Sequence, residues 1–233
     1  MYAGIDGCRF GWIAVRIEQD KVSFELARNI HDLAYIYENS MALIDIPIGL
    51  SEHSERVCDS EARQILKPNR HSSVFLTPVR AAVYAETYAE ACRLNYIATG
   101  KKISKQVWNI LPKVKEIDTL MREYPGANLR EAHPEVCFWA LNNRTACRCN
   151  KKTAEGISER LHILEPLLPG ISQKITSYAA ANLKKHVSID DIVDAAVLAR
   201  TVARPDSLLS LGNGEKDQAG ISMEIVNAGK IDS

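Results

Sequence analysis

Three short strand patterns at the start of the chain constrain the fold more than any other feature. Apolar and β-branched residues dominate residues 2–6, 12–17 and 22–27, and only short turns separate them. The turn from Gly7 to Gly11 is short enough for an antiparallel hairpin. We therefore expect an antiparallel meander that carries one acidic residue, Asp6, near the end of an otherwise apolar first strand.

A fourth strand pattern, residues 41–46, follows a helical pattern over residues 31–38. Because residues 41–46 are nearly all apolar, we expect a strand that is buried on both faces and parallel to a neighbour, with the preceding helix as the crossover. Asp45 is its only charge and falls at its carboxyl end, where open α/β sheets bind ligands. Asp45 is therefore a candidate partner for Asp6.

The rest of the chain is mostly helical. Residues 50–128 contain no strand pattern, and we interpret them as a helical insertion or lid within one domain spanning residues 1–233. A further strand is expected at 129–133 and a strand-turn-strand tail at 208–211 and 221–226. Helices are expected over residues 55–66 with a cap at Ser54, 78–99, 104–123 as one or two helices with a kink or break at Pro112, 134–141, 153–164, 172–184 and 188–203. The fold class is thus α/β, with a mixed sheet and flanking helices.

The last of these helices carries two informative acids. Asp191 lies three residues after Ser188, so a capping box would explain it without any site. Asp194 lies beyond the first turn and precedes an apolar segment, and a buried carboxylate needs a partner. Because they are three residues apart, Asp191 and Asp194 project from one side of the helix.

Carboxylates at two strand ends and on one helix face are the ligands that Mg²⁺ or Mn²⁺ would need. Two such ions about 4 Å apart can position a water molecule, polarise a phosphoryl group and stabilise the leaving oxygen. Phosphodiester hydrolysis is the chemistry that this arrangement favours.

Six ordered motifs resemble one family nearly from end to end. The chain is similar to the family called domain of unknown function 429, described as predicted nucleases of ribonuclease H-like fold, and its opening also resembles RuvC-type Holliday junction resolvases. The motifs are Gly-Ile-Asp-Gly-Cys-Arg-Phe-Gly-Trp from Gly4, Ile-Asp-Ile-Pro-Ile-Gly-Leu from Ile44, Arg-His-Ser-Ser-Val-Phe from Arg70, Glu-Ala-His-Pro-Glu-Val-Cys-Phe from Glu131, Lys-Lys-Thr from Lys151 and Asp-Asp-Ile-Val-Asp-Ala from Asp190.

The resemblance implies a ribonuclease H-like sheet and a set of metal ligands. Asp6 matches the first-strand ligand, Asp45 the acid on the fourth strand, and Asp191 with Asp194 the paired acids on the last helix. Two further residues have no resolvase counterpart and could add a ligand or a general base, namely Glu131 and His133. The alternative for His133, which precedes Pro134, is a helix cap.

Substrate contacts are expected around these acids and in the helical insertion. Gly7 stands where resolvase-like openings usually have proline, and it leaves room for a phosphate to approach the backbone. Arginine presents a two-pronged donor to phosphate. The candidate substrate-binding residues are Gly7, Arg9, Arg56, Arg63, Arg70, Ser72, Ser73 and Arg80. For basic residues of the insertion, the alternative is the solvated face of a helix.

Composition leaves the partner open. Lys plus Arg and Asp plus Glu number 29 each, so net charge favours neither a nucleic acid nor a phosphate-containing small molecule. No run is long and apolar enough for a membrane span, and six scattered cysteines without a leader sequence favour a cytoplasmic protein with reduced thiols. Two alternatives to a metal-dependent nuclease remain: a nucleotide-binding ATPase or phosphotransferase related to actin and sugar kinases, and a non-catalytic scaffold of the same fold.

Overall fold

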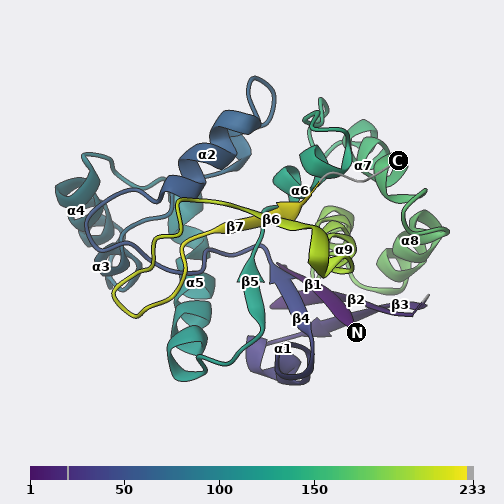
Figure 1. Cartoon of the computed structure of the whole chain (residues 1–233), viewed down its shortest axis with the longest axis horizontal. Helices are drawn as coiled ribbons and strands as arrows, with labels where there is room; N and C mark the ends of the chain where they lie inside the picture. Colours follow the sequence, from purple (N-terminus) through teal and green to yellow (C-terminus); the bar gives the residue numbers. More distant parts are fainter. Residues whose placement is uncertain (20, 230–233) are drawn as a thin grey trace.

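The computed structural model describes residues 1–19 and 21–229, which form a mixed sheet surrounded by helices (Figure 1). The sheet has the order β3-β2-β1-β4-β5, with β4 and β5 parallel to β1, and β2 and β3 antiparallel, as the sequence predicts. Its strands are β1 (Tyr2–Gly7), β2 (Trp12–Glu18), β3 (Lys21–Ala27), β4 (Met41–Ile44) and β5 (Leu129–Glu131). A separate antiparallel pair consists of β6 (Leu208–Leu211) and β7 (Ile225–Ala228).

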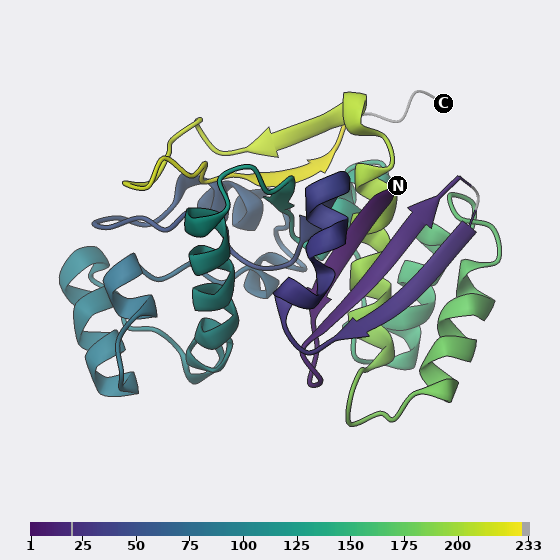
Figure 2. The ribbon, with the colours of Figure 1, turned by 90° about the horizontal axis from the view of Figure 1, so that it is seen from below.

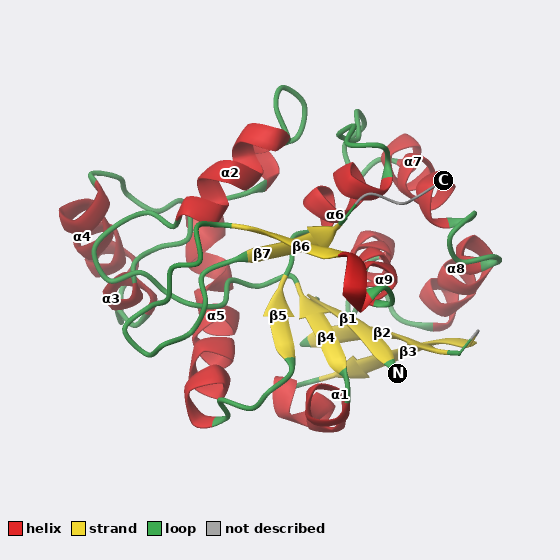
Figure 3. Ribbon diagram, in the orientation of Figure 1, coloured by secondary structure: helices red, strands yellow, loops and turns green. Residues whose placement is uncertain are grey.

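Along the chain, the helices occur between the strands of the sheet and after the last of them. Figure 3 shows the helices in red and the strands in yellow. Between β3 and β4 lie the 3₁₀ turn η1 (Ile30–Leu33) and α1 (Ala34–Asn39). Between β4 and β5 lie α2 (Val57–Ile65), η2 (His71–Ser73), α3 (Arg80–Val83), α4 (Tyr88–Thr99) and α5 (Lys105–Glu123). After β5 come α6 (Pro134–Leu141), α7 (Ala154–Leu164), α8 (Ile171–Ala181), α9 (Ile189–Val202) and η3 (Pro205–Ser207). The division of the chain into a domain and an insertion stays a prediction.

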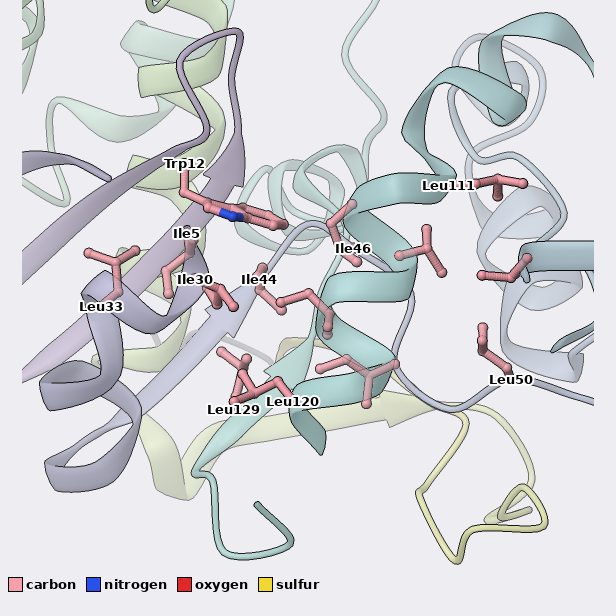
Figure 4. Packing of buried hydrophobic residues seen from close by; sticks show 14 of the residues in the cluster. Ile5, Trp12, Ile30, Leu33, Ile44, Ile46, Leu50, Leu111, Leu120 and Leu129 are labelled. Atoms are coloured by element: carbon pink, nitrogen blue, oxygen red, sulfur yellow. The ribbon is translucent and has the colours of Figure 1, made fainter. Parts of the chain in front are cut away.

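Each face of the sheet has its own core. Alternate residues of β1, β2 and β4, such as Ile5, Trp12 and Ile44, pack with α1 and α5 (Figure 4). The opposite face, which includes Ile13 and Leu43, packs against α6, α8 and α9. This alternation is the two-residue period of a strand, and Figure 2 shows α1 and α9 on opposite sides of the sheet.

Helix α9 lies unusually close to β1. A Cβ added at Gly4 would come within 2.1 Å of the carbonyl oxygen of Ala195 and 2.3 Å of the nitrogen of Ala199. Only glycine at this strand position, facing the small residues of α9, permits such an approach. This close packing fixes the position of α9 along β1, so that the first turns of α9 lie near the carboxyl end of β1.

The structure corrects several element boundaries. The helix expected over 78–99 is divided into α3 and α4, because the hydroxyl of Thr87 accepts a hydrogen bond from the Glu90 N–H and starts a new helix. Helix α2 is capped at Arg56 and not at Ser54. Pro112 lies within a continuous α5, where its ring is exposed while the neighbouring apolar face stays packed.

The tail also differs from the expectation. Strand β7 begins at Ile225, not at residue 221, because Asp217 organises the preceding connection by accepting hydrogen bonds from the backbone N–H groups of Leu50, Ala219 and Ile221. Among the described residues, no helix is both long enough and apolar enough to cross a membrane. All six cysteines are free thiols.

Candidate metal centre

Three aspartates from three separate elements converge at the carboxyl ends of β1 and β4. Asp6, Asp45 and Asp194 each offer a carboxylate oxygen, and these oxygens lie within 4.8 Å of one another. Asp6 and Asp194 are buried, whereas Asp45 is partly exposed. The convergence that the sequence predicts for these three residues is therefore present in the structure.

The register of the sheet explains why the carboxylates meet. β1 pairs with β4 in parallel, with Ile5 opposite Ile44, so Asp6 and Asp45 follow at adjacent places on the same edge. Both point to the face that α9 covers, because they share the parity of Gly4 and Leu43 along their strands. The close contact of α9 with Gly4 then places Asp194 next to Asp6 and Asp45 at the edge where β1 and β4 end.

Burial makes the ionised form of these acids unfavourable. Desolvation, together with the charges of Asp45 and Asp194, raises the pKa of Asp6 well above its ordinary value. Desolvation also raises the pKa of Asp45, and it raises that of Asp194 to about 7 despite the opposing charge of Lys151. The Oδ1 atom of Asp194 is buried and has no hydrogen-bond partner among the described residues.

Lys151 is the cation in contact with this cluster, and it was given no role in the sequence-based assignment. Its Nζ donates a hydrogen bond to Oδ2 of Asp194. Burial by itself would lower the pKa of Lys151, but the charges of Asp194, Asp6 and Asp45 outweigh it and raise the pKa. Gly156 holds the connection in place, since a Cβ there would lie 1.8 Å from the Asn150 carbonyl oxygen.

Two members of the cluster reach an open cleft with a volume of about 490 Å³. Asp6 and Asp45 line it, and residues around η2 and on α5 also contribute to the lining. Further lining residues are Gly7, Arg70, Ser72, Ser73, Phe75, Lys113, His133, Asn150, Lys151 and Lys152. A ligand in the cleft would therefore meet acidic groups as well as basic and hydroxyl groups.

Asp191 is placed apart from the three carboxylates. Its Oδ2 accepts a hydrogen bond from the backbone N–H of Ser188 at 2.9 Å, which completes the capping box of α9. This is the alternative that the sequence left open for Asp191. Its charge still acts on the centre, because it contributes to raising the pKa of Asp6.

Glu131 belongs to a buried ion-pair network and not to the metal cluster. Both of its oxygens accept from the guanidinium of Arg56 at 2.7 Å, and Arg56 also pairs with Asp59 at 2.5 Å. Arg56 is 1% exposed, so it cannot reach a phosphate as the sequence had suggested. The network ties the start of α2 to the end of β5, and we assign both residues a structural role.

His133 caps α6 at the wall of the cleft. Its Nδ1 accepts from the backbone N–H of Glu135 at 3.2 Å, so the cap alternative for this residue is present in the structure. Glu135, a residue absent from the predicted site, is 3% exposed and pairs through Oε1 with Arg160 at 2.5 Å. Its second oxygen, Oε2, has no partner among the described residues.

The remaining predicted substrate contacts divide into two groups. Gly7, Arg70, Ser72 and Ser73 line the cleft. Arg80 is bound by three carboxylates, Glu52, Asp118 and Asp217, which join the helices between β4 and β5 to the tail. Arg63 donates to the Val74 carbonyl at 2.6 Å, and Arg9 is exposed on the β1–β2 turn outside the cleft.

Comparison with known proteins gives a family. The family model of domain of unknown function 429, described as a protein of unknown function, matches residues 4–216. No curated protein and no solved structure shows significant similarity to the chain. Because the match covers the sheet, the aspartate cluster and all of the helices, the chain belongs to the domain of unknown function 429 family.

Proposed function

We propose that this protein is a divalent-metal-dependent phosphodiester hydrolase whose metal is held by Asp6, Asp45 and Asp194. The observation that carries the proposal is the meeting of three carboxylates, two of which line an open cleft, while one buried oxygen, Oδ1 of Asp194, has no donor among the described residues. Oxygen ligands of this kind suit Mg²⁺ or Mn²⁺.

The charge balance supports a cation beyond Lys151. Among the described residues, only Lys151 lies within salt-bridge distance of any of the three carboxylates, so their ionised forms would keep two unpaired negative charges, which one divalent ion would balance. Without a further cation the acids must keep protons, as their raised pKa values indicate. A purely structural cluster would be expected to pair each acid, as the chain does for Glu131 and Asp59 around Arg56.

The chain's own groups account for the other requirements of hydrolysis. When bound, the metal would activate a water molecule and polarise a phosphoryl oxygen. Lys151 keeps Asp194 oriented through its hydrogen bond, and the Gly7 N–H fixes Oδ1 of Asp6 at 2.7 Å. Arg70 and Lys152 at the cleft wall supply positive charge to a phosphate.

The test is a cleavage assay with matched variants. Purified protein should cleave at least one member of a panel of single-stranded, double-stranded and branched DNA and RNA with Mg²⁺ or Mn²⁺, and Asp45→Asn should abolish cleavage. Asp190→Asn, an acid at the start of α9 outside the cluster, is the control. ATP hydrolysis in place of strand cleavage would favour the phosphotransferase alternative, and no turnover together with no metal binding would favour a scaffold.

A further inference from the structure

Among the described residues, three cations at the cleft are not paired with a carboxylate, whereas four arginines elsewhere in the fold are. Arg56, Arg80, Arg130 and Arg160 are each paired with at least one carboxylate. Three cleft cations, Arg70, Lys113 and Lys152, have no carboxylate partner within the described part of the chain. An unpaired cation at the wall of a cleft is available to bind an anion that is not part of the chain.

Lys113 is the most informative of these. It is half-buried, its Nζ donates to the carbonyl of Gly11, and the ammonium lies 4.2 Å from the centre of the Trp12 ring. Gly7 lacks the side chain that would block it, since a Cβ there would be 2.9 Å from Cδ of Lys113. Neutral groups therefore hold the ammonium next to Gly7 at the cleft, and it keeps donors for an anion.

The cleft does not end at these residues. A second hollow of about 260 Å³ shares a wall with it, and the shared residues include Ser72, Ser73 and Phe75. Lys102, an exposed lysine without a carboxylate partner among the described residues, lines the second hollow. An anion long enough to use Lys113 and Lys102 together would pass along the segment from Ser72 to Phe75.

We propose that the ligand is a single strand of nucleic acid, at least two nucleotides long, that lies across both hollows. The inference rests on the proposed function and names the substrate class of the same centre. Successive phosphates would meet cations from separate elements, and Phe75 offers an aromatic surface on which a base can stack. Hollows of this size admit individual nucleotides, whereas a duplex presents only its outer backbone to them.

The test measures binding separately from cleavage. A fluorescent single strand of about ten nucleotides is titrated in EDTA, so that it stays intact, over a range of salt concentrations. Four phosphate contacts predict a slope of log K against log salt of about −3, and Lys113→Met and Lys102→Met should each reduce it by about 0.7. Phe75→Ala should weaken binding about tenfold. Lys174→Met, on the exposed face of α8 outside both hollows, should change nothing.

Two comparisons make the proposal refutable. Lys113→Arg keeps the charge and should keep the slope, which separates loss of a contact from loss of folding. A duplex or a mononucleotide that binds as tightly as the single strand would overturn the proposal, as would an unchanged slope in Lys102→Met. Binding with the expected salt slopes and variant effects, but without any cleavage in Mg²⁺, would instead contradict the proposed hydrolase. Single-stranded nucleic acid would then remain the proposed ligand.

Discussion

The raised pKa of Asp194 predicts an unusual dependence of stability on pH in the metal-free protein. Its pKa rises from the ordinary 3.8 to about 7, mainly through desolvation. Between about pH 4 and about pH 7, Asp194 therefore keeps a proton in the folded state that it has already lost in the unfolded chain. The contribution of Asp194 to the free energy of unfolding is fully present below about pH 4, and it is lost as the pH rises from there through about 7.

The size of the effect follows from the shift. Each pKa unit corresponds to about 1.4 kcal/mol, so ionising Asp194 in the fold opposes folding by about 4 kcal/mol well above pH 7. Between about pH 5 and about pH 8 the free energy of unfolding should fall by about 3 kcal/mol from this residue alone. Asp194→Asn, which has no proton to lose, should lack that decline and should be the more stable protein at about pH 8.

Urea unfolding in EDTA at the two pH values, with both proteins, provides the measurement. Adding Mg²⁺ or Mn²⁺ at about pH 8 should restore stability to the wild type and not to Asp194→Asn, because a ligand of the native state stabilises it. Equal pH slopes for the two proteins would refute the reasoning, since Asp194 would then ionise in the fold as it does in water.

Three further substitutions test other parts of the account. Lys151→Met should tighten Mn²⁺ binding about tenfold in calorimetry, because it removes the positive charge closest to the carboxylates; weaker binding would show that Lys151 organises the site more than it repels the ion. Gly4→Ala should cost about 3 kcal/mol in urea unfolding and reduce metal binding by displacing α9, whereas Gly126→Ala, with no atom within 4 Å of the added Cβ, should be close to neutral. Glu131→Gln should lower stability by about 3 kcal/mol by breaking the pair with Arg56, yet leave the cleavage rate of the folded protein unchanged; loss of that rate at full stability would return Glu131 to the catalytic site.

The sequence predicts the sheet and the three converging acids for physical reasons. Strand periodicity and the buried run before Asp45 determine which strands are antiparallel and which are parallel, and parallel strands end on a common edge. Asp6 and Asp45 follow from that rule alone. Asp194 follows from its position in an apolar helical segment, where a carboxylate is costly.

The residues that the sequence does not predict depend on long-range packing. Lys151 lies on an irregular connection, and its position is set by contact with Gly156 and by the place of α7 beside α9. The pairing of Arg56 with Glu131 joins residues 75 apart in the chain, so no local pattern distinguishes Arg56 from a phosphate-binding arginine. For Asp191 and His133 the local signals for a cap were present, and the structure has those caps.

The central claim is tested most directly by locating Mn²⁺ in the protein. An anomalous difference map from a crystal grown with Mn²⁺ should show a peak coordinated by oxygens of Asp6, Asp45 and Asp194, next to the cleft that Asp6 and Asp45 line. A crystal with all three carboxylates ordered and no peak between them, or with Mn²⁺ bound only elsewhere, would contradict the account.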